Sequence, residues 1–250
     1  MPKPRNAKLE SAKPKDGAVE VTFQNEKGEV KKYTVEKVLM ATGRGPNSSN
    51  IGLDKIGVTL ERGFVKVNQY METSVKGVYA IGDVTGGAQF THLANYHAGL
   101  VIRNALFRLP VKVNADLVPR VTFTDPELAH VGLTEAEARA RKLTIRLLRW
   151  PYHENDRAQA ERETVGHIKV VTDGRGKILG ATIVGAGAGE LITTWTLAIS
   201  RGLPIRALAG IIVPYPTLAE IGKRAAVTYF TPSLTNIWVR RIIALLRRFG

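Results

Sequence analysis

The chain of 250 residues contains no cysteine. Its fold therefore has no disulfide framework, no thiolate zinc site and no catalytic thiol of its own. Buried apolar surface has to supply the stability instead. A hydrophobic content of 44% is sufficient for a sizeable core, arranged as one large or two modest domains.

The chain is also strongly basic, with a formal net charge of +14. Clustered Lys and Arg residues neutralise phosphates, so nucleic-acid binding is one interpretation. The basic residues are dispersed, however, apart from Lys3 to Lys15 and the last dozen residues, and no zinc-finger or RNP-type aromatic motif accompanies them. We therefore predict no nucleic-acid partner, and interpret the charge as a source of solubility and of attraction for anionic cofactors.

The N-terminal region shows no targeting signal. Met1 to Arg5 lacks the apolar core of a signal peptide, and no run of 18 apolar residues follows, so the sequence predicts neither secretion nor a membrane-spanning helix. A cytoplasmic location is expected. Residues 1–16 are rich in Lys and Pro and are expected to form a flexible basic leader.

Alternating and apolar runs predict several strands in the first half of the chain. Val19 to Phe23 alternates, Asn25 to Gly28 has turn chemistry, and Val30 to Val35 alternates again, which predicts a β-hairpin. Two short apolar runs that end in glycine, Val35 to Thr42 and Gly77 to Gly82, have the format of buried strands in a cofactor-binding sheet. A small exposed strand is expected near Phe64 and Val65.

Helical periodicity then extends from Thr91 to Leu109, with His97 among the apolar positions, and Pro110 ends it. A change of composition near Asp116 marks a domain boundary. The following residues predict four strands and three helices without βαβ spacing, which indicates an α+β domain. The strands are expected at 120–124, 145–150, 166–171 and 178–184, and the helices at 134–141, opened by a capping box, 189–200 and 217–229.

Three motifs occur in a specific order and spacing. They are Val38-Leu39-Met40-Ala41-Thr42-Gly43-Arg44-Gly45-Pro46-Asn47, Gly77-Val78-Tyr79-Ala80-Ile81-Gly82-Asp83-Val84 and Pro214-Tyr215-Pro216-Thr217-Leu218-Ala219-Glu220. Together they resemble the FAD-dependent pyridine nucleotide-disulfide oxidoreductases, the family of dihydrolipoamide dehydrogenase, glutathione reductase and mercuric reductase. The resemblance extends from about Val19 to about Tyr229. The chain is similar to the C-terminal portion of these enzymes, including their dimerisation domain.

The resemblance implies the fold class and its division. We expect an α/β FAD/NAD-binding fragment followed by an α+β dimerisation domain. Residues 17–40 would be the end of the NAD(P)-binding domain, 41–115 the second segment of the FAD-binding domain and 116–231 the dimerisation domain, ahead of a basic amphipathic helix at 232–250. Neither Gly-rich dinucleotide turn of the family is in the sequence, and neither is its Cys pair.

The resemblance also implies the cofactor-binding residues, which are Thr42, Gly43, Arg44, Gly82, Asp83, Phe90 and Thr91. A carboxylate after a glycine at a strand end can accept hydrogen bonds from ribityl hydroxyls while the glycine lets the cofactor approach the backbone. Asp83 alone would more often be a turn-capping residue. Thr91 matches a position whose amide approaches the flavin ring at the positive end of a helix, and its structural alternative is an ordinary N-cap.

Tyr215 and Glu220 match the catalytic pair of the family. In dihydrolipoamide dehydrogenase and glutathione reductase the residue at position 215 is a His that pairs with the Glu and serves as acid-base partner of a thiol across the dimer interface. A tyrosine, with an ordinary pKa of about 10, does not shuttle protons in that way at neutral pH. Mercuric reductases resemble this chain in carrying Tyr there, but they also end in a cysteine pair that this chain lacks.

Other motifs are interpreted as structural. His92 and His97 are five residues apart and do not share a helical face, and no carboxylate completes a metal site with them, so no metal is predicted. His153 and His167 have no evident partner. Gly185 to Gly189 resembles a phosphate cradle, but it follows a hairpin strand, so a plain loop before a packed helix is expected.

Residues Asn236 to Phe249 form a basic amphipathic helix in projection. Trp238, Ile242, Leu245 and Phe249 share one face, and the arginines at 240, 241, 247 and 248 share the other. Packing onto its own domain or a partner subunit is the preferred interpretation, and an anionic membrane surface is the alternative.

The resemblance implies that the chain is part of an enzyme that passes electrons from NAD(P)H through FAD to a disulfide, a metal ion or a quinone. Alone, the chain is expected to be an incomplete catalyst that holds FAD weakly or not at all, and to form a homodimer. A missing N-terminal FAD/NAD polypeptide would complete the enzyme. The rival hypothesis is a non-catalytic dimerisation or interaction module that shares the fold.

Overall fold

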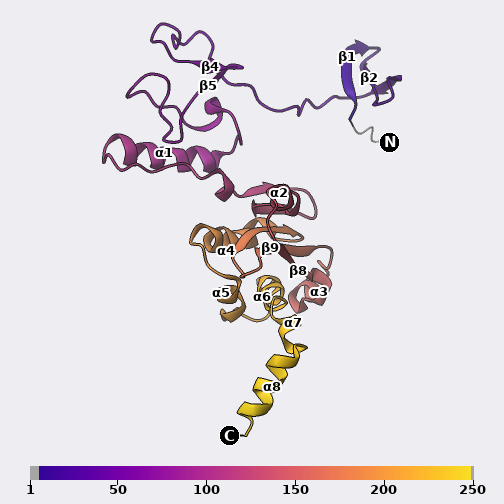
Figure 1. Ribbon diagram of the computed structural model, residues 1–250. Coiled ribbons are helices and arrows are strands. Elements are labelled where there is room, and N and C mark those ends of the chain that lie inside the picture. Colours follow the sequence, from indigo (N-terminus) through magenta and orange to yellow (C-terminus); the bar gives the residue numbers. More distant parts are fainter. Residues whose placement is uncertain (1–5, 249–250) are drawn as a thin grey trace.

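The computed structural model describes residues 6–248, which form a small β-sheet, a middle segment and a mixed domain (Figure 1). The strands of the first two parts are β1 (Lys8–Lys15), β2 (Ala18–Gln24), β3 (Val30–Val35), β4 (Leu60–Glu61) and β5 (Phe64–Val65). Those of the mixed domain are β6 (Arg120–Thr122), β7 (Leu128–Gly132), β8 (Ile145–Pro151), β9 (His167–Asp173) and β10 (Ile178–Val184). The helices are α1 (Thr91–Ala105), α2 (Glu135–Ala140), α3 (Asp156–Glu161), α4 (Ala188–Ser200), α5 (Ile205–Gly210), α6 (Glu220–Val227), α7 (Thr231–Leu234) and α8 (Ile237–Leu246).

The first sheet is antiparallel, in the order β1-β2-β3. The predicted hairpin is confirmed as β2 and β3, and Phe23 stacks on Tyr33 across it with ring centroids 5.1 Å apart. The expectation of a flexible leader was wrong for residues 8–15, because they pair with β2 along its open edge and so satisfy backbone hydrogen bonds. The lysines of β1 do not prevent this pairing, and they protect the outer edge of the sheet, which β1 now forms. Residues 1–5 of the expected leader lie outside the described residues.

The segment that follows β3 does not form the predicted strand. Val38, Leu39 and Met40 have irregular backbone and are 37%, 89% and 61% exposed, in the long connection visible in Figure 1. A β-strand requires a hydrogen-bonded neighbour, and none of the strands within residues 6–248 pairs with this run. The prediction for Gly77 to Gly82 was also wrong, since only an isolated bridge between Glu72 and Tyr79 forms there.

Helix α1 was predicted and is confirmed, although it ends at Ala105 rather than Leu109. Its buried positions are Leu93, His97 and Leu100, which lie on one face at the spacing of an amphipathic helix. The chain leaves the helix through Arg108, whose φ is 52°. Helix α1 therefore ends several residues before Pro110.

The mixed domain contains a five-stranded antiparallel sheet in the order β6-β7-β10-β9-β8. The predicted strands at 120–124, 145–150, 166–171 and 178–184 correspond to β6, β8, β9 and β10, whereas β7 was not foreseen. The capping box at Thr134 and Glu137 opens α2 as predicted. The predicted helix at 217–229 begins later, as α6, after a turn.

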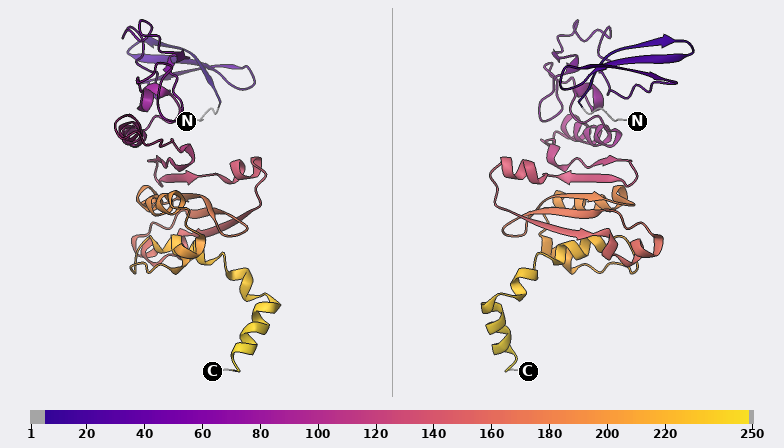
Figure 2. Two further views of the ribbon diagram at one scale, coloured as in Figure 1. Left: turned by 60° about the vertical axis from the view of Figure 1, so that its left-hand side comes forward. Right: turned by 90° about the vertical axis from the view of Figure 1, so that its right-hand side faces the viewer.

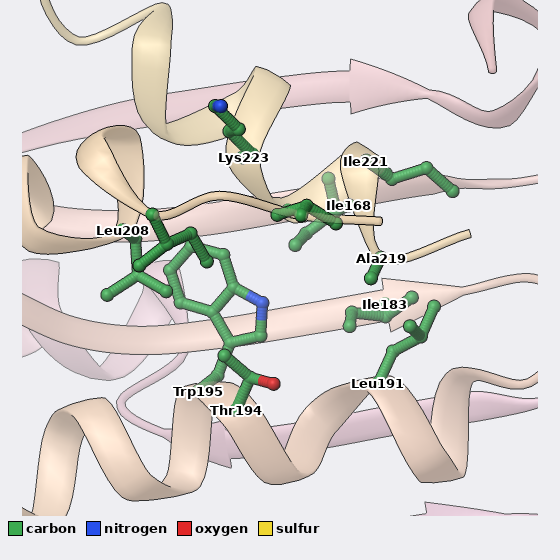
Figure 3. A pocket seen from close by; sticks show the side chains of 12 residues that line it. Ile168, Ile183, Leu191, Thr194, Trp195, Leu208, Ala219, Ile221 and Lys223 are labelled. Carbon is green, nitrogen blue, oxygen red and sulfur yellow. The ribbon is translucent and has the colours of Figure 1, made fainter. Parts of the chain in front are cut away.

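The alternation of strand residues divides the core between the two faces of this sheet. Ile168 and Val170 of β9 pack into the main core with α4, α5 and α6, whereas Val171 packs with Ala138 of α2 on the opposite face. Figure 3 shows Trp195, which is 2% exposed, extending from α4 with Leu208 beside its ring, and both side chains line a cavity of about 50 Å³. The predicted α+β architecture is confirmed, with helices on both faces of the sheet.

The chain leaves this domain through α7 and α8, and α8 projects away from the sheet and its helices (Figures 1 and 2). No side chain of α8 is buried by the rest of residues 6–248. Of the two expected packing partners, its own domain was therefore wrong, because most of its apolar side chains are exposed, whereas packing on a partner subunit stays a prediction. No helix within residues 6–248 has the length and apolar character needed to cross a membrane.

Candidate functional site

The turn before α1 is built around a glycine that no other residue could replace without strain. Gly82 starts a short 3₁₀ helix, Gly82–Thr85, with a φ of 70°, and a Cβ atom placed there would lie 2.9 Å from the Cβ atom of Ala94 in α1. The Gly82 backbone amide donates to Nδ1 of His97 at 3.2 Å. This turn is therefore fastened directly against the buried face of α1.

Asp83 follows in the same turn and carries the charge of the site. Its Oδ2 atom lies 3.5 Å from Nη1 of Arg44, and both side chains remain exposed to solvent. Gln89 adds a second link to this region, since its Nε2 atom donates to the backbone carbonyl of Arg44 at 3.5 Å. Arg44 and Asp83, two predicted cofactor residues that are 39 positions apart in the sequence, are thus brought together.

The N-terminus of α1 faces the same region. Phe90 is the N-cap, with extended backbone and no side-chain cap hydrogen bond, so the alternative interpretation of Thr91 as an N-cap was wrong and Thr91 is the first helical residue. The first amides of a helix have no partner within it and carry partial positive charge. Phe90 stacks on His92 with ring centroids 5.0 Å apart, which fixes the entry of the chain into the helix.

Two of the predicted cofactor residues lie outside this group. Thr42 and Gly43 are exposed and belong to the irregular connection before Arg44. Gly43 has a φ of 105°, a value that favours glycine. The structure therefore groups Arg44, Gly82, Asp83, Phe90 and Thr91.

His97 was foreseen only as a structural residue, and the structure gives it a specific role. Burial lowers the pKa of the His97 imidazole, which keeps the ring neutral. A neutral Nδ1 atom can accept the Gly82 amide, whereas a protonated one cannot. The apolar spacing of His97 with Leu93 and Leu100 is the sequence signal for its burial, but not for its acceptor role.

A cavity of about 320 Å³ lies between this turn and the mixed domain. Gly86, Gly87 and His97 line one side, and Arg120 and Glu137 line the other. Its volume is near the lower limit for ligand pockets. Arg44, Asp83, Phe90 and Thr91 do not line this cavity. The group around Asp83 nevertheless fits one part of a flavin dinucleotide, because Asp83 offers a carboxylate to hydroxyl groups and α1 offers free amides to an anionic ring.

Tyr215 lies in the loop before α6, and its hydroxyl group donates to Oδ2 of Asp156 at 2.9 Å. That hydrogen bond and the negative charge of Asp156 raise the pKa of the Tyr215 phenol, with a smaller contribution from Glu220. The phenol is 70% exposed and protonated at neutral pH. Asp156 is 59 residues away, and nothing in the sequence indicated this pairing.

Glu220 is the first residue of α6 and is half-buried. Its carboxylate at a helix N-terminus is stabilised by the helix dipole. Tyr215 and Glu220 are five positions apart in the sequence, but the hydroxyl group of Tyr215 donates its hydrogen bond to Asp156 rather than to Glu220. Both residues belong to the mixed domain, away from the group around Asp83.

The glycine-rich loop at 185–189 packs against protein groups. A Cβ atom on Gly185 would lie 2.2 Å from the ring of Tyr152, whose hydroxyl donates to the Ala186 carbonyl at 2.9 Å. The Glu127 carboxylate accepts from the Gly189 amide at 2.8 Å at the start of α4. These contacts support the interpretation of this loop as a packing element.

The histidines form separate local contacts. His92 Nε2 lies 2.9 Å from the Pro119 carbonyl oxygen, and the buried ring of His130 lies between Thr182 Oγ1 and the Gly132 carbonyl. Burial lowers the pKa of His130 as well. Within residues 6–248, no group of three His, Cys, Asp or Glu residues is placed to hold a metal ion.

Family models match most of the chain. The model described as pyridine nucleotide-disulphide oxidoreductase matches residues 5–98, and the model described as the dimerisation domain of the same family matches residues 118–226. The first match covers the group around Asp83, and the second covers the five-stranded sheet and α2 to α6. The two matches occur in the order that the sequence motifs predicted.

Curated relatives have the same names that the motifs suggested. The chain is 38% identical to a mercuric reductase from Bacillus cereus over 86% of this chain and 34% of that protein. It is 37% identical to a dihydrolipoyl dehydrogenase from Bacillus subtilis (strain 168) over 88% of this chain and 47% of that protein. The chain thus spans between about a third and a half of the length of these relatives.

Solved structures agree with this assignment. LpdA from Mycobacterium tuberculosis superposes with a TM-score of 0.82 at 28% identity, over 89% of this chain and 48% of that one. The Cu(II) complex of the flavoprotein disulfide reductase RclA from Escherichia coli superposes with a TM-score of 0.80 at 27% identity, over 89% of this chain and 50% of that one. By its motifs, its fold and these matches, the chain belongs to the pyridine nucleotide-disulphide oxidoreductase family.

Proposed function

We propose that this chain contributes the second FAD-contacting segment and the dimerisation domain of an FAD-dependent NAD(P)H oxidoreductase. The observation that carries the proposal is the turn at Gly82 and Asp83, held against α1 by His97 and joined by Arg44. FAD, when bound, accepts a hydride from NAD(P)H and passes electrons to an acceptor. The acceptor is a disulfide, a metal ion or a quinone.

In this proposal each residue of the group has a separate task. Asp83 accepts hydrogen bonds from ribityl hydroxyl groups, and Arg44 holds its carboxylate in place. Gly82 lets the cofactor approach the backbone, and the amide of Thr91 stabilises negative charge on the flavin ring with the positive end of α1. Thr42 and Gly43, which precede Arg44 directly in the chain, complete the cofactor-binding set. Phe90 sets the direction of the helix.

Tyr215 has a different task from the histidine of thiol-dependent relatives. The Tyr215 phenol has an ordinary pKa of about 10, which Asp156 raises further, so Tyr215 donates a hydrogen bond and does not serve as a base at neutral pH. This favours a metal ion or a quinone over a thiol-disulfide substrate. The names of two relatives, a mercuric reductase and a copper complex of a disulfide reductase, support metal-ion reduction. Glu220 orients the loop from the N-terminus of α6.

Catalysis in this proposal depends on parts outside these 250 residues. The sequence supplies no cysteine and neither Gly-rich dinucleotide turn, so a further N-terminal FAD/NAD polypeptide provides them. Two copies of the chain associate through the dimerisation domain, which brings Tyr215 toward the flavin site of the partner subunit. We propose a cytoplasmic setting for this reaction.

A second candidate function rests on the missing cysteine pair. A chain without cysteine can keep the dimerisation fold as an interaction module and have no part in electron transfer. This alternative predicts that FAD has no specific affinity for the group around Asp83.

Titration of FAD into the purified chain tests the proposal, with bound flavin measured by fluorescence. Binding should be too weak to survive gel filtration, because only part of the contacts is present, and Asp83→Asn should weaken it further by about tenfold, or ~1.4 kcal/mol. Asp54→Asn removes an exposed carboxylate elsewhere in the same segment and should leave binding unchanged. Equal FAD affinity in all three proteins would favour the interaction module, and a stoichiometric complex that survives gel filtration would contradict the expected weak binding.

A further inference from the structure

Helix α8 presents an apolar face that the rest of the described chain leaves uncovered. Around the helix axis, Trp238, Val239, Ile242, Ile243, Leu245 and Leu246 occupy an arc of roughly 160° at 3.6 residues per turn. All of them except the half-buried Val239 are exposed, with Trp238 at 65% and Leu246 at 60%. An apolar stripe of this kind in water indicates a binding surface.

The opposite arc of the helix is cationic. Arg240, Arg241, Arg247 and Arg248 lie there, and the sequence contains no Asp or Glu after Glu220. The guanidinium of Arg241 lies 5.1 Å from the ring centre of Trp238, at the border between the two arcs. Long arginine side chains at such a border can keep their charge in water while their stems cover apolar surface.

The position of α8 makes this surface accessible. The helix projects beyond the mixed domain (Figure 2) and follows the last residue matched by the dimerisation-domain model, which is residue 226. Its ten residues are about 15 Å long, which is half the thickness of a bilayer core of about 30 Å. The helix can therefore lie in a membrane surface but cannot cross it.

We propose that α8 binds the surface of an anionic lipid membrane, with its apolar face among the acyl chains and its arginines at the headgroups. The charge pattern selects this occupant over a second copy of the helix. Two α8 helices packed through their apolar faces would leave the arginines on the outer sides of the pair, with no acidic residue between Ile221 and Gly250 to neutralise them. Anionic headgroups provide the missing negative charge, and each basic residue near such a surface adds to the attraction.

Trp238 provides a direct measurement of this contact. The chain has three tryptophans, of which Trp195 is buried and Trp150 is half-buried, so Trp238 is the exposed reporter. Addition of phosphatidylcholine/phosphatidylglycerol vesicles to the full chain should shift its emission to shorter wavelength. Vesicles of phosphatidylcholine alone should not. Trp238→Phe should lose the shift but retain vesicle binding, because phenylalanine keeps the apolar contact.

Sedimentation with the same vesicles separates α8 from the general basic charge of the chain. Arg240→Gln/Arg241→Gln should reduce partition into anionic vesicles roughly tenfold or more. Lys55→Gln/Lys76→Gln removes the same charge near β4 and β5 and should have little effect. Ile242→Gln/Leu246→Gln keeps the charge and removes apolar contact, and it should abolish binding.

Three results would overturn the proposal. One is the absence of sedimentation with anionic vesicles at low salt, and another is binding that the two lysine substitutions reduce as much as the two arginine substitutions. The third is concentration-dependent self-association that Ile242→Gln/Leu246→Gln abolishes, without vesicle binding by the unchanged chain. That result would assign the apolar face to a second copy. FAD titration of the same variants keeps this test separate from that of the oxidoreductase proposal.

Discussion

At the residue scale, the site depends on the protonation state of one buried histidine. Gly82 has no side chain to hold it, so the position of the turn that carries Asp83 relies on its backbone hydrogen bond to His97. That bond requires an unprotonated Nδ1 atom. The helix that buries His97 therefore also maintains the acceptor that the turn needs.

We predict that the chain loses stability as pH falls below about 6.5, the ordinary pKa of histidine. Burial lowers the pKa of His97 in the folded chain, so the unfolded chain binds more protons in this range, and the free energy of unfolding decreases with acid. Urea unfolding at pH 5 and pH 7 measures the difference. His97→Gln should reduce it without removing it, because burial also lowers the pKa of His130.

The exposed His153 provides the control for the replacement of a histidine, and His153→Gln should leave the stability at pH 7 unchanged. If His97→Gln and the unchanged chain lost equal stability between pH 7 and pH 5, His97 would not be the titrating group that secures the turn.

At the scale of elements, the junction between β10 and α4 shows how a glycine-rich loop can serve packing. Gly185 has a φ of 150° and lies against the buried ring of Tyr152, while Glu127 caps the start of α4 through the Gly189 amide. A carboxylate at this helix N-terminus stabilises the helix through its dipole. The loop thereby joins the residue before β7 and the residue after β8 to the start of α4.

Gly185→Ala should destabilise the chain by roughly 3 kcal/mol or more, because the added Cβ atom would overlap the Tyr152 ring in a backbone conformation that favours glycine. Thermal or urea unfolding measures the loss. Gly174→Ala in the β9–β10 turn is the matched control, since its Cβ atom meets nothing within 4 Å. Similar stability of the two variants would show that the backbone of the loop can shift to accommodate the added Cβ atom, and that Tyr152 does not hold the loop in place.

At the scale of the whole molecule, the mixed domain leaves apolar side chains uncovered in the loop that contains Tyr215 and on α4. Ile212 is 95% exposed and Ile211 is 39% exposed in the loop before α6, and Leu197 of α4 is 57% exposed. This domain matches the family's dimerisation model. A second copy would cover these side chains, and obligate dimers bury roughly 2,000 Å² or more.

We predict a homodimer at protein concentrations of roughly tens of micromolar, measured by light scattering. Ile212→Asp should convert it to a monomer, because an unpaired carboxylate would be buried at the interface. Ile56→Asp introduces the same charge at another exposed isoleucine and should preserve the dimer. Monomeric behaviour of the unchanged chain, or a dimer unaffected by Ile212→Asp, would count against this interface.

The sequence by itself determined the parts of the fold that rest on local interactions. Thr134 and Glu137 are three residues apart and form their capping box within one helical turn. The β2–β3 and β9–β10 hairpins and the helices α1, α4 and α8 follow from turn residues and from periodicities of two and 3.6 residues. The order and spacing of three motifs also identified the family, since they carry its binding chemistry.

Only the tertiary structure decided which distant residues meet. The apolar run at Val38 to Met40 has strand composition but no neighbouring strand within residues 6–248, and composition cannot supply the partner that a ladder requires. Likewise, Tyr215 meets Asp156 and Gly82 meets His97 because separate elements pack together. Hydrogen bonds and pKa shifts depend on distance in space, whereas sequence patterns report only distance along the chain.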